Sequence, residues 1–289
     1  MKTQFKTFIQ LLIAGIFAIF TTSCNKKNDV TPATATGTLE FHLHTDVDSN
    51  EVDSIGLVYN LVYNSYAGRG ITVSQAHLLI SNIQLIGTNG AVAYNVPGRI
   101  IHKVQPIEPY VVGNVPVGNY NAVSYTVGLD AATNATVPVP TDTALYDPTL
   151  WFATGAASVA GFASYAPTVP STGGYIYLDF EGTIDTSAAK TGKYAPFHFR
   201  IGGGTNNINA VKVTLPNQGF TVSANQTTFV HMVINYAALL NNLPLNNLQI
   251  IETSADNSTY ASYISSITSN ISTGASGALQ HFISYEAGQ

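Results

Sequence analysis

Apolar and polar residues alternate along short runs that begin near Gly37 and continue toward the end of the chain. Side chains two apart on a strand point to the same face, so this alternation predicts strands with one face on a core and one toward water. Gly, Pro and Asn separate the runs and supply turn chemistry. The candidate strands are residues 38–47, 71–87, 110–115, 120–130, 174–184, 196–203, 210–216 and 226–235.

Many short strands without alternating helices indicate an all-β domain over residues 37–289, an antiparallel β-sandwich of Greek-key type with long irregular loops. Helix signals are weak, and residues 236–241 and parts of 258–272 are expected to form a turn or two each. The segment 131–173 contains five prolines, and no strand is expected in it. A loop of this length is either disordered or functional. Residues 278–286 are a candidate last strand.

The first 24 residues have the layout of a secretory signal, with a basic start, an apolar run over residues 8–20 and small residues before Cys24. A lone cysteine in that place predicts a bacterial lipoprotein. The signal peptide would cover residues 1–23, a lipid would be attached to Cys24, and residues 24–36 would form a flexible tether. The alternative is a single-pass anchor, but an apolar run of about 13 residues is short of the roughly 20 that span a bilayer.

A lipid on Cys24 would hold the mature chain in the cell envelope, facing the periplasm or on the outer-membrane surface, with the membrane as a partner. Cys24 is the only cysteine, so the mature chain can form no internal disulfide and no thiolate metal site. Signal removal takes away two of the 11 basic residues and none of the 16 acidic ones, which moves the net charge from −5 to −7. An acidic chain with 9% charged residues has no basic patch, and we expect no nucleic-acid partner.

Histidines supply the candidate metal ligands. His42 and His44 lie two apart, so on a strand both rings would point to the same face, about 6–7 Å apart. His198 and Arg200 repeat this spacing. Neutral imidazole suits zinc and copper, although histidines on a polar face can equally meet solvent or bond to neighbours. Histidines that occur singly in strand-like runs are expected to be structural: His77, His102 and His231.

Signatures of nucleophilic or metal-dependent catalysis are missing from the sequence, which contains no G-x-S-x-G, no H-E-x-x-H and no P-loop. Two acidic pairs, Asp46/Asp48 and Asp179/Glu181, would each lie on one face of a strand. Such pairs bind calcium or solvate an outer surface, and solvation is the favoured interpretation here because neither pair has the Asp/Asn-rich loop typical of calcium sites. A hydrolase that uses Asp179 or Glu181 is the weakest hypothesis, and we expect the protein not to be an enzyme.

Four strings of the chain occur in an order and spacing that resemble one protein family. They are GITVS with LLISNIQL (70–85), VPVGNY with YTVGLD (115–130), GYIYLDFEG (174–182) and IGG (201–203). Together they are similar to the MbnP-like family of secreted and lipid-anchored bacterial proteins, which is named after a copper-binding partner of methanobactin systems. The resemblance covers residues 38–286, nearly the whole mature chain.

The resemblance implies a β-sandwich and a mononuclear copper site built from histidines and an oxidised tryptophan. Trp151 is the candidate match for that tryptophan, and His42 or His44 lies near a histidine of the family's first strand. The family's histidine before I-G-G falls at Arg200, whose guanidinium cannot ligate a metal. His198, two residues earlier on the same face, is the expected substitute.

Two functional hypotheses follow. The first is a non-catalytic cell-envelope lipoprotein that binds copper through His42, His44 and His198, with Trp151 nearby. The second is a metal-free binding or assembly module that uses the 131–173 loop to contact a protein, peptide or glycan of the envelope. The folded geometry discriminates between them, because rings within about 4–5 Å of one point favour a metal site and scattered rings favour a partner module.

Overall fold

The part of the chain that the computed structural model describes comprises residues 34–47, 57–64, 68–103, 108–152, 174–202, 210–215, 219–246, 251–253, 261–272 and 282–285. The predicted signal peptide, Cys24 and most of the predicted tether lie outside these residues. The chain divides into two units, Met1–Thr34 and Ala35–Gln289, and every strand and helix named below belongs to the second. Within the described ranges, no helix combines the length and apolar character that crossing a bilayer requires.

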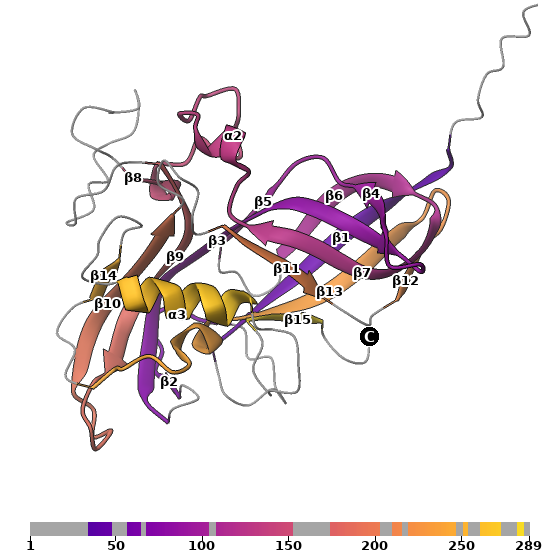
Figure 1. The fold of residues 1–289 in the computed structure, drawn as a ribbon. Helices are drawn as coiled ribbons and strands as arrows, with labels where there is room; N and C mark the ends of the chain where they lie inside the picture. Colours follow the sequence, from indigo (N-terminus) through magenta and orange to yellow (C-terminus); the bar gives the residue numbers. More distant parts are fainter. Residues whose placement is uncertain are drawn as a thin grey trace, which may run out of the picture. The chain divides into compact units, whose positions relative to one another are not determined.

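Within the described residues, four strands form the smaller sheet, in the order β15-β13-β1-β6 (Figure 1). Their bounds are Ile283–Tyr285 for β15, Thr227–Asn235 for β13, Thr36–Asp46 for β1 and Glu108–Pro116 for β6. β1 pairs with β13 in parallel and with β6 antiparallel, and β13 pairs antiparallel with β15. The β1/β13 pair therefore joins two segments that are far apart in the sequence.

The larger sheet has eleven strands in the described residues, with the central order β11-β7-β3-β9-β10-β14. The bounds on this path are Val211–Leu215 (β11), Gly118–Val127 (β7), Gly70–Gly87 (β3), Gly174–Asp185 (β9), Tyr194–Gly202 (β10) and Ile251–Thr253 (β14). Five short strands pair at its margins: Tyr63–Asn64 (β2), Val92–Asn95 (β4), Ile100–Lys103 (β5), Trp151–Phe152 (β8) and Phe220–Val222 (β12).

The all-β prediction is confirmed, and each of the eight candidate strands corresponds to a strand of the fold. The candidate last strand at 278–286 also forms, as β15. Two pairs, β1/β13 and β10/β14, are parallel, whereas the sequence predicted an antiparallel arrangement. Alternation marks which face of a strand is apolar but carries no information on strand direction, so this difference could not be read from the pattern.

The long strand β3 contains several register shifts, and two bulges among them keep its apolar side chains on one face. Opposite β9, Val73 pairs with Gly182 and Gln75 with Glu181, so Ser74 is an extra residue. A second shift, against β7, falls between Ser81 and Gln84. A one-residue slip turns a side chain to the other face. As a result, the residues that face the main core are spaced irregularly: Ile71, Val73, Ala76, Leu78, Ile80, Ile83 and Leu85.

Local hydrogen bonds hold the second bulge, which contains the S-N-I string. Asn82 adopts a left-handed conformation with φ of 50°, which Asn tolerates better than most residues. The Ser81 hydroxyl donates to the carbonyl of Gly128 at 2.6 Å, and the Gly128 N–H donates to the carbonyl of Leu79 at 2.9 Å. Gly128 has φ of +121°, which favours glycine. The S-N-I and Y-T-V-G-L-D strings therefore stabilise each other across β3 and β7.

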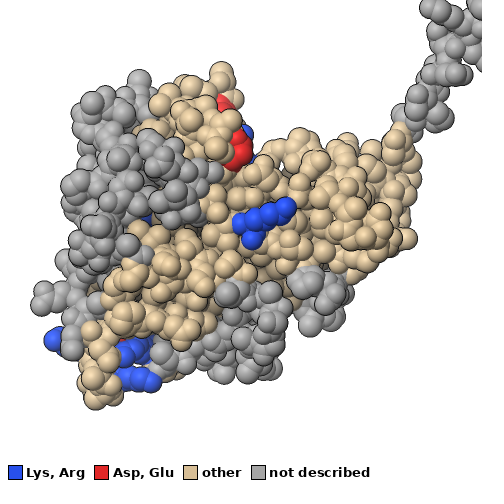
Figure 2. Space-filling view, in the orientation of Figure 1, with Lys and Arg blue, Asp and Glu red and all other residues tan. Residues whose placement is uncertain are grey.

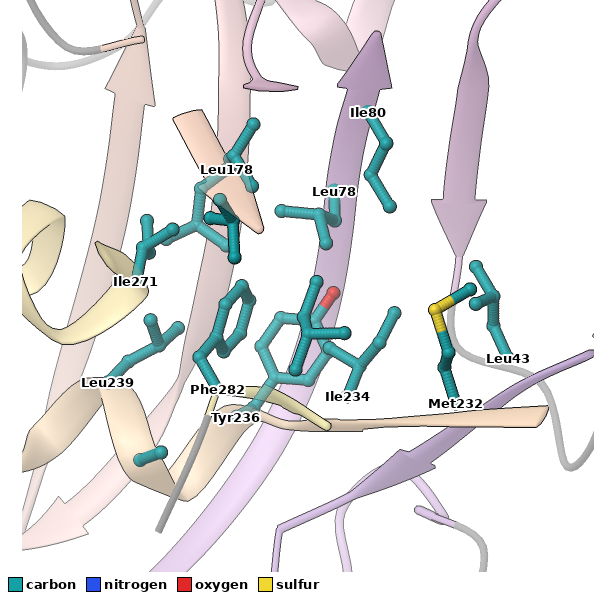
Figure 3. Packing of buried hydrophobic residues seen from close by; sticks show 14 of the residues in the cluster. Leu43, Leu78, Ile80, Leu178, Met232, Ile234, Tyr236, Leu239, Ile271 and Phe282 are labelled. Carbon is teal, nitrogen blue, oxygen red and sulfur yellow. The ribbon is translucent and has the colours of Figure 1, made fainter. Parts of the chain in front are cut away.

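The main core lies between the inner faces of the two sheets. Figure 3 shows side chains of the smaller sheet, such as Leu43 and Met232, together with Leu78 and Leu178 of the larger sheet. All four are buried. Burial of apolar side chains is the main stabilising contribution, since each fully buried Leu or Met contributes about 1.5–3 kcal/mol.

Two helical segments complete this core. The 3₁₀ helix η3 spans Tyr236–Leu240 and begins at Asn235, whose side chain accepts from the Ala237 N–H at 3.0 Å. Helix α3 spans Ala261–Ser272 and contacts η3 and β11. It buries Ile264, Ile267 and Ile271 at helical spacing. Both segments were predicted as a turn or two, but α3 has 12 residues, about three turns.

The prediction of an irregular loop without strands over 131–173 is wrong for its first half. This part contains a short helix α2 (Ala131–Asn134), the 3₁₀ turn η2 (Pro148–Leu150) and β8. Asp130 and Asp147 cap α2 and η2 through their side chains. Capping by Asp stabilises even short helices, and this local chemistry outweighed the Pro- and Ala-rich composition. Residues 153–173 lie outside the described part.

Contacts on the outer face of the larger sheet hold the segment 131–152. Its apolar side chains form a second, smaller core with β3 and β9: Leu79, Leu129, Leu145, Trp151, Tyr175 and Tyr177. Asp142 accepts from Arg99 at 2.5 Å, and Asp147 from Lys103 at 2.5 Å. The segment is therefore a fixed cover over part of the sheet.

Candidate functional site

Three histidines gather on the outer face of the smaller sheet. His42 and His44 alternate along β1 with Leu39, Phe41 and Leu43, which point into the core. In the parallel register, His42 lies directly opposite His231 of β13. The ring centroids of His42 and His231 are 4.7 Å apart, and those of His44 and His231 are 5.9 Å apart.

Two further side chains border these rings. The Phe229 ring lies 4.7 Å from the His42 ring, centroid to centroid, and is 50% exposed. Glu40 approaches His42, with 3.6 Å between Oε2 and Nε2. We refer to Glu40, His42, His44, Phe229 and His231 as the histidine face. It combines three half-buried imidazoles with one carboxylate and one exposed aromatic ring.

A second polar cluster covers the outer face of the larger sheet at β3, β9 and β10. In the antiparallel register His198 lies opposite Glu181, and Arg200 opposite Asp179. On the other side of β9, Gln75 pairs with Glu181 and His77 with Asp179. The inward neighbours on these strands, such as Phe180 and Phe199, belong to the main core. We refer to Gln75, His77, Asp179, Glu181, His198 and Arg200 as the carboxylate face.

Charge pairing organises the carboxylate face. The Arg200 guanidinium contacts the Glu181 carboxylate, and its Nε lies 3.9 Å from Oδ1 of Asp179. His198 Nδ1 is 3.3 Å from Oε2 of Glu181. The Gln75 amide donates to Asp179.

Burial separates the two acids of this cluster. Asp179 is fully buried, and desolvation, followed by the charge of Glu181, raises its pKa well above the usual value. Burial also opposes ionisation of Glu181, but the adjacent His198 imidazole and the charge of Arg200 lower its pKa to about 2. Burial thus disfavours the charged form of Asp179, while Glu181 carries a negative charge beside the positive charge of Arg200.

Solvation of an outer surface, the favoured interpretation of the Asp179/Glu181 pair, is wrong for Asp179, whose exposed fraction is zero. A substrate cannot reach a carboxyl that is fully enclosed, so this pair does not suit acid–base hydrolysis. In the other pair, Asp46 is buried and accepts from the Val47 N–H at 2.6 Å, while Asp48 lies outside the described residues.

His77 is the member of the carboxylate face that also contacts the segment 131–152, through Thr149. Its Nδ1 is 3.3 Å from the Thr149 hydroxyl. Burial is the main cause that lowers its pKa from 6.5 to about 4, and the positive charge of Lys103 acts in the same direction. His77 is therefore neutral at physiological pH. In the folded chain it also stays neutral at pH values between 6.5 and about 4, at which a free histidine is mostly protonated.

The lowered pKa of His77 predicts a pH dependence of stability. Between pH 6.5 and about 4 the unfolded chain takes up a proton on His77 that the folded chain does not. The free energy of unfolding should therefore fall as the pH drops through this window, by about 3 kcal/mol at most. Urea unfolding should show a smaller fall for His77→Gln than for the wild type. Equal falls in both proteins would contradict this assignment.

Trp151 lies on the outer face of the larger sheet, away from the histidine face. β8 pairs with β9, and Trp151 is opposite Tyr175, with ring centroids 4.9 Å apart in an edge-on arrangement. The indole is buried, and its Nε1 has no hydrogen-bond partner among the described residues. Two residues before Trp151, the hydroxyl of Thr149 lies 3.3 Å from Nδ1 of His77, which belongs to the carboxylate face.

The predicted metal ligands thus fall into two groups on different sheets. His42 and His44 lie on the smaller sheet, whereas His198 and Trp151 belong to the larger one. These four side chains do not fit a single copper site in this structure. Across the described ranges, no three His, Cys, Asp or Glu side chains already converge as metal ligands do.

His231 is the site residue that sequence reasoning missed. It was expected to be structural because it occurs alone in its strand, yet it lies against His42 and His44. Only the parallel pairing of β1 with β13 brings it there, and that pairing joins residues almost 190 positions apart. His102, also expected to be structural, is fully buried and bonds Thr45 at 2.8 Å.

Charge is sparse on the surface that Figure 2 shows, where Lys and Arg appear mainly as one group over the centre and a small gathering at the lower left. This distribution agrees with the low content of charged residues, 9% of the chain.

The fold and its two clusters define an all-β sandwich protein that presents polar groups on rigid strands. The family model of MbnP matches residues 36–259, and the chain belongs to the MbnP family. Among solved structures, MbnP from Methylosinus trichosporium is similar to it, with 12% sequence identity, coverage of 76% of this chain and 82% of that chain, and a TM-score of 0.39. A comparison with curated proteins gives no match.

Proposed function

We propose that this member of the MbnP family is a non-catalytic lipoprotein of the cell envelope that binds copper at the histidine face. The observation that carries the proposal is the cluster of His42, His44 and His231 on one outer face, with ring centroids 4.7 and 5.9 Å from the shared ring of His231. Imidazole nitrogen is a ligand that both oxidation states of copper accept.

Small side-chain movements would complete such a site. The His231 ring already lies against the rings of His42 and His44. A rotamer change that turns one nitrogen of each ring toward a common point would complete the site, and changes of this size are common on binding. Glu40, beside His42, offers a carboxylate that can orient the imidazole through its second nitrogen. The strands beneath are fixed by the core, which keeps the ligands at constant spacing.

Copper titration tests the proposal. The mature chain, purified without lipid, should bind about one equivalent of copper with a dissociation constant below about 1 μM. Competition with a chromophoric chelator measures this for Cu(I) and for Cu(II). Binding weaker than that in both oxidation states would contradict the copper assignment.

A metal-free binding module remains the second candidate, and one observation favours it. Phe229 is 50% exposed, and Val111, opposite Glu40 on β6, is 68% exposed. Exposed apolar side chains beside polar ones are typical of surfaces that contact a protein, peptide or glycan. If copper does not bind while Phe229→Ala weakens the association with an envelope partner, this second function is supported.

The proposed anchor has its own test. A chain with a lipid on Cys24 should incorporate an alkyne-labelled fatty acid when it is expressed in a bacterium, and Cys24→Ala should abolish the label and leave an unprocessed signal peptide. The label should also place the wild-type protein in the membrane fraction. A processed protein without label would contradict the lipoprotein assignment.

A further inference from the structure

The carboxylate face has the donor set of a metal site, with a guanidinium among its members. Glu181 and His198 lie directly opposite each other on β9 and β10, and Asp179 lies opposite Arg200 in the next position of the same face. Directly opposite side chains on antiparallel strands have Cβ atoms about 4.5–5.5 Å apart, close enough for two of them to share one ion. Two carboxylates and an imidazole are suitable ligands for zinc.

Arg200 occupies the centre of this arrangement. Its guanidinium contacts Glu181 and lies 3.9 Å from Asp179, and its side chain is only 13% exposed. The negative charge of Glu181 is thus already balanced by a cation that is part of the chain. A guanidinium stays protonated at any physiological pH and presents only donors, so it can never join a metal's ligand shell.

We propose that Arg200 is a built-in substitute for a metal ion that closes the carboxylate face to cations. A divalent cation would have to displace the guanidinium from Glu181 and would then meet its positive charge within a few ångströms. Replacing Arg200 with the histidine that the family resemblance implies at this position would open the carboxylate face to a divalent cation, because two imidazoles would then lie beside Asp179 and Glu181.

Zinc binding to Arg200→His tests the proposal. Zinc is the probe because it accepts imidazole and carboxylate and undergoes no redox chemistry. Isothermal titration should show one additional zinc equivalent in Arg200→His relative to the wild type, bound at least about 100-fold more tightly than any zinc on this face of the wild type. Adding Glu181→Gln to the variant should abolish the gain.

The matched control is Lys212→His, which makes a similar exchange of a cation for an imidazole on β11. Lys212 is exposed, and its Nζ is 3.3 Å from Oε1 of Gln84, with no acid pair described beside it. This variant should gain no zinc site. A second readout is the melting temperature, which zinc should raise for Arg200→His and leave unchanged for the control.

Two results would overturn the proposal. One is a folded Arg200→His protein that binds no more zinc than Lys212→His. The other is a wild-type protein whose zinc binding is weakened by Glu181→Gln, since the face would then already be open. If Arg200→His does not fold, the double variant Arg200→His/Asp179→Asn removes the buried acid. This double variant is also expected to bind one additional zinc ion, through Glu181 and His198. The histidine face is unchanged in every variant, so failure here is distinguishable from failure of the copper proposal.

Discussion

Replacing His231 with Ala is expected to reduce copper affinity on the order of 100-fold or more, because it removes the ring that the other two histidines share. His231 is the only one of the three that contacts both of the others at ring-to-ring distances of 4.7 and 5.9 Å in the described structure. Loss of His42 or His44 alone should have a smaller effect, since each leaves a pair of imidazoles in place. Competition titration of the three variants measures this order.

His198→Ala is the matched control for His231→Ala. His198 has surroundings like those of His42, a member of the histidine face. The side chain of His198 is 31% exposed and that of His42 is 20% exposed, and both lie next to a glutamate on an outer face. The control should retain wild-type copper affinity. If His198→Ala loses copper while His231→Ala keeps it, the ligand set predicted from the sequence holds and the assignment to the histidine face is wrong.

Gly182→Ala is expected to destabilise the fold by about 3 kcal/mol or more, because the added carbon has no space. A Cβ on Gly182 would lie 1.9 Å from the carbonyl oxygen of Thr72 and 3.1 Å from the Cα of Val73. Both are backbone atoms of β3 next to its first bulge, so relief requires movement of the strand. Glycine at this point lets β3 and β9 approach closely.

Gly118→Ala supplies the comparison. A Cβ there has its nearest neighbour at 3.8 Å, and Gly118 does not need a left-handed backbone. Its free energy of unfolding should stay within about 0.5 kcal/mol of the wild type. Urea denaturation of both variants measures the difference. Equal stability of Gly182→Ala and Gly118→Ala would show that β3 and β9 are not packed as described.

Strand positions were predictable because they depend on local alternation. The eight candidate strands were found from apolar residues that recur every second position, and burial of one face enforces that pattern. The bulges at Ser74 and after Ser81 were not predictable in this way, since a bulge appears in the sequence only as a break in alternation. Such a break looks the same as the end of a strand.

The histidine face was half predictable. The spacing of His42 and His44 indicated that both rings share a face, and the structure places both on the outer face of β1. The third ring depends on the pairing of β1 with β13, which is a property of the tertiary fold. Trp151 was grouped with His42 through the family resemblance, and His198 because it lies two residues before Arg200 on the same face. Only the sheet topology separates them from His42.

The electrostatics of the carboxylate face depended on burial, which spacing does not reveal. Asp179 and Glu181 were correctly expected on one face of a strand. Their opposite pKa shifts arise because Asp179 is enclosed, while Glu181 takes the contacts with Arg200 and His198. Neither contact can be inferred from the distance between two residues in the sequence.

The most direct test of the copper assignment is nuclear magnetic resonance of the histidine rings during titration with Cu(I), which is diamagnetic. We expect the imidazole signals of His42, His44 and His231 to shift together and saturate at about one equivalent, with those of His77, His102 and His198 unchanged. Shifts confined to His198, or no shift at any ring, would contradict the assignment.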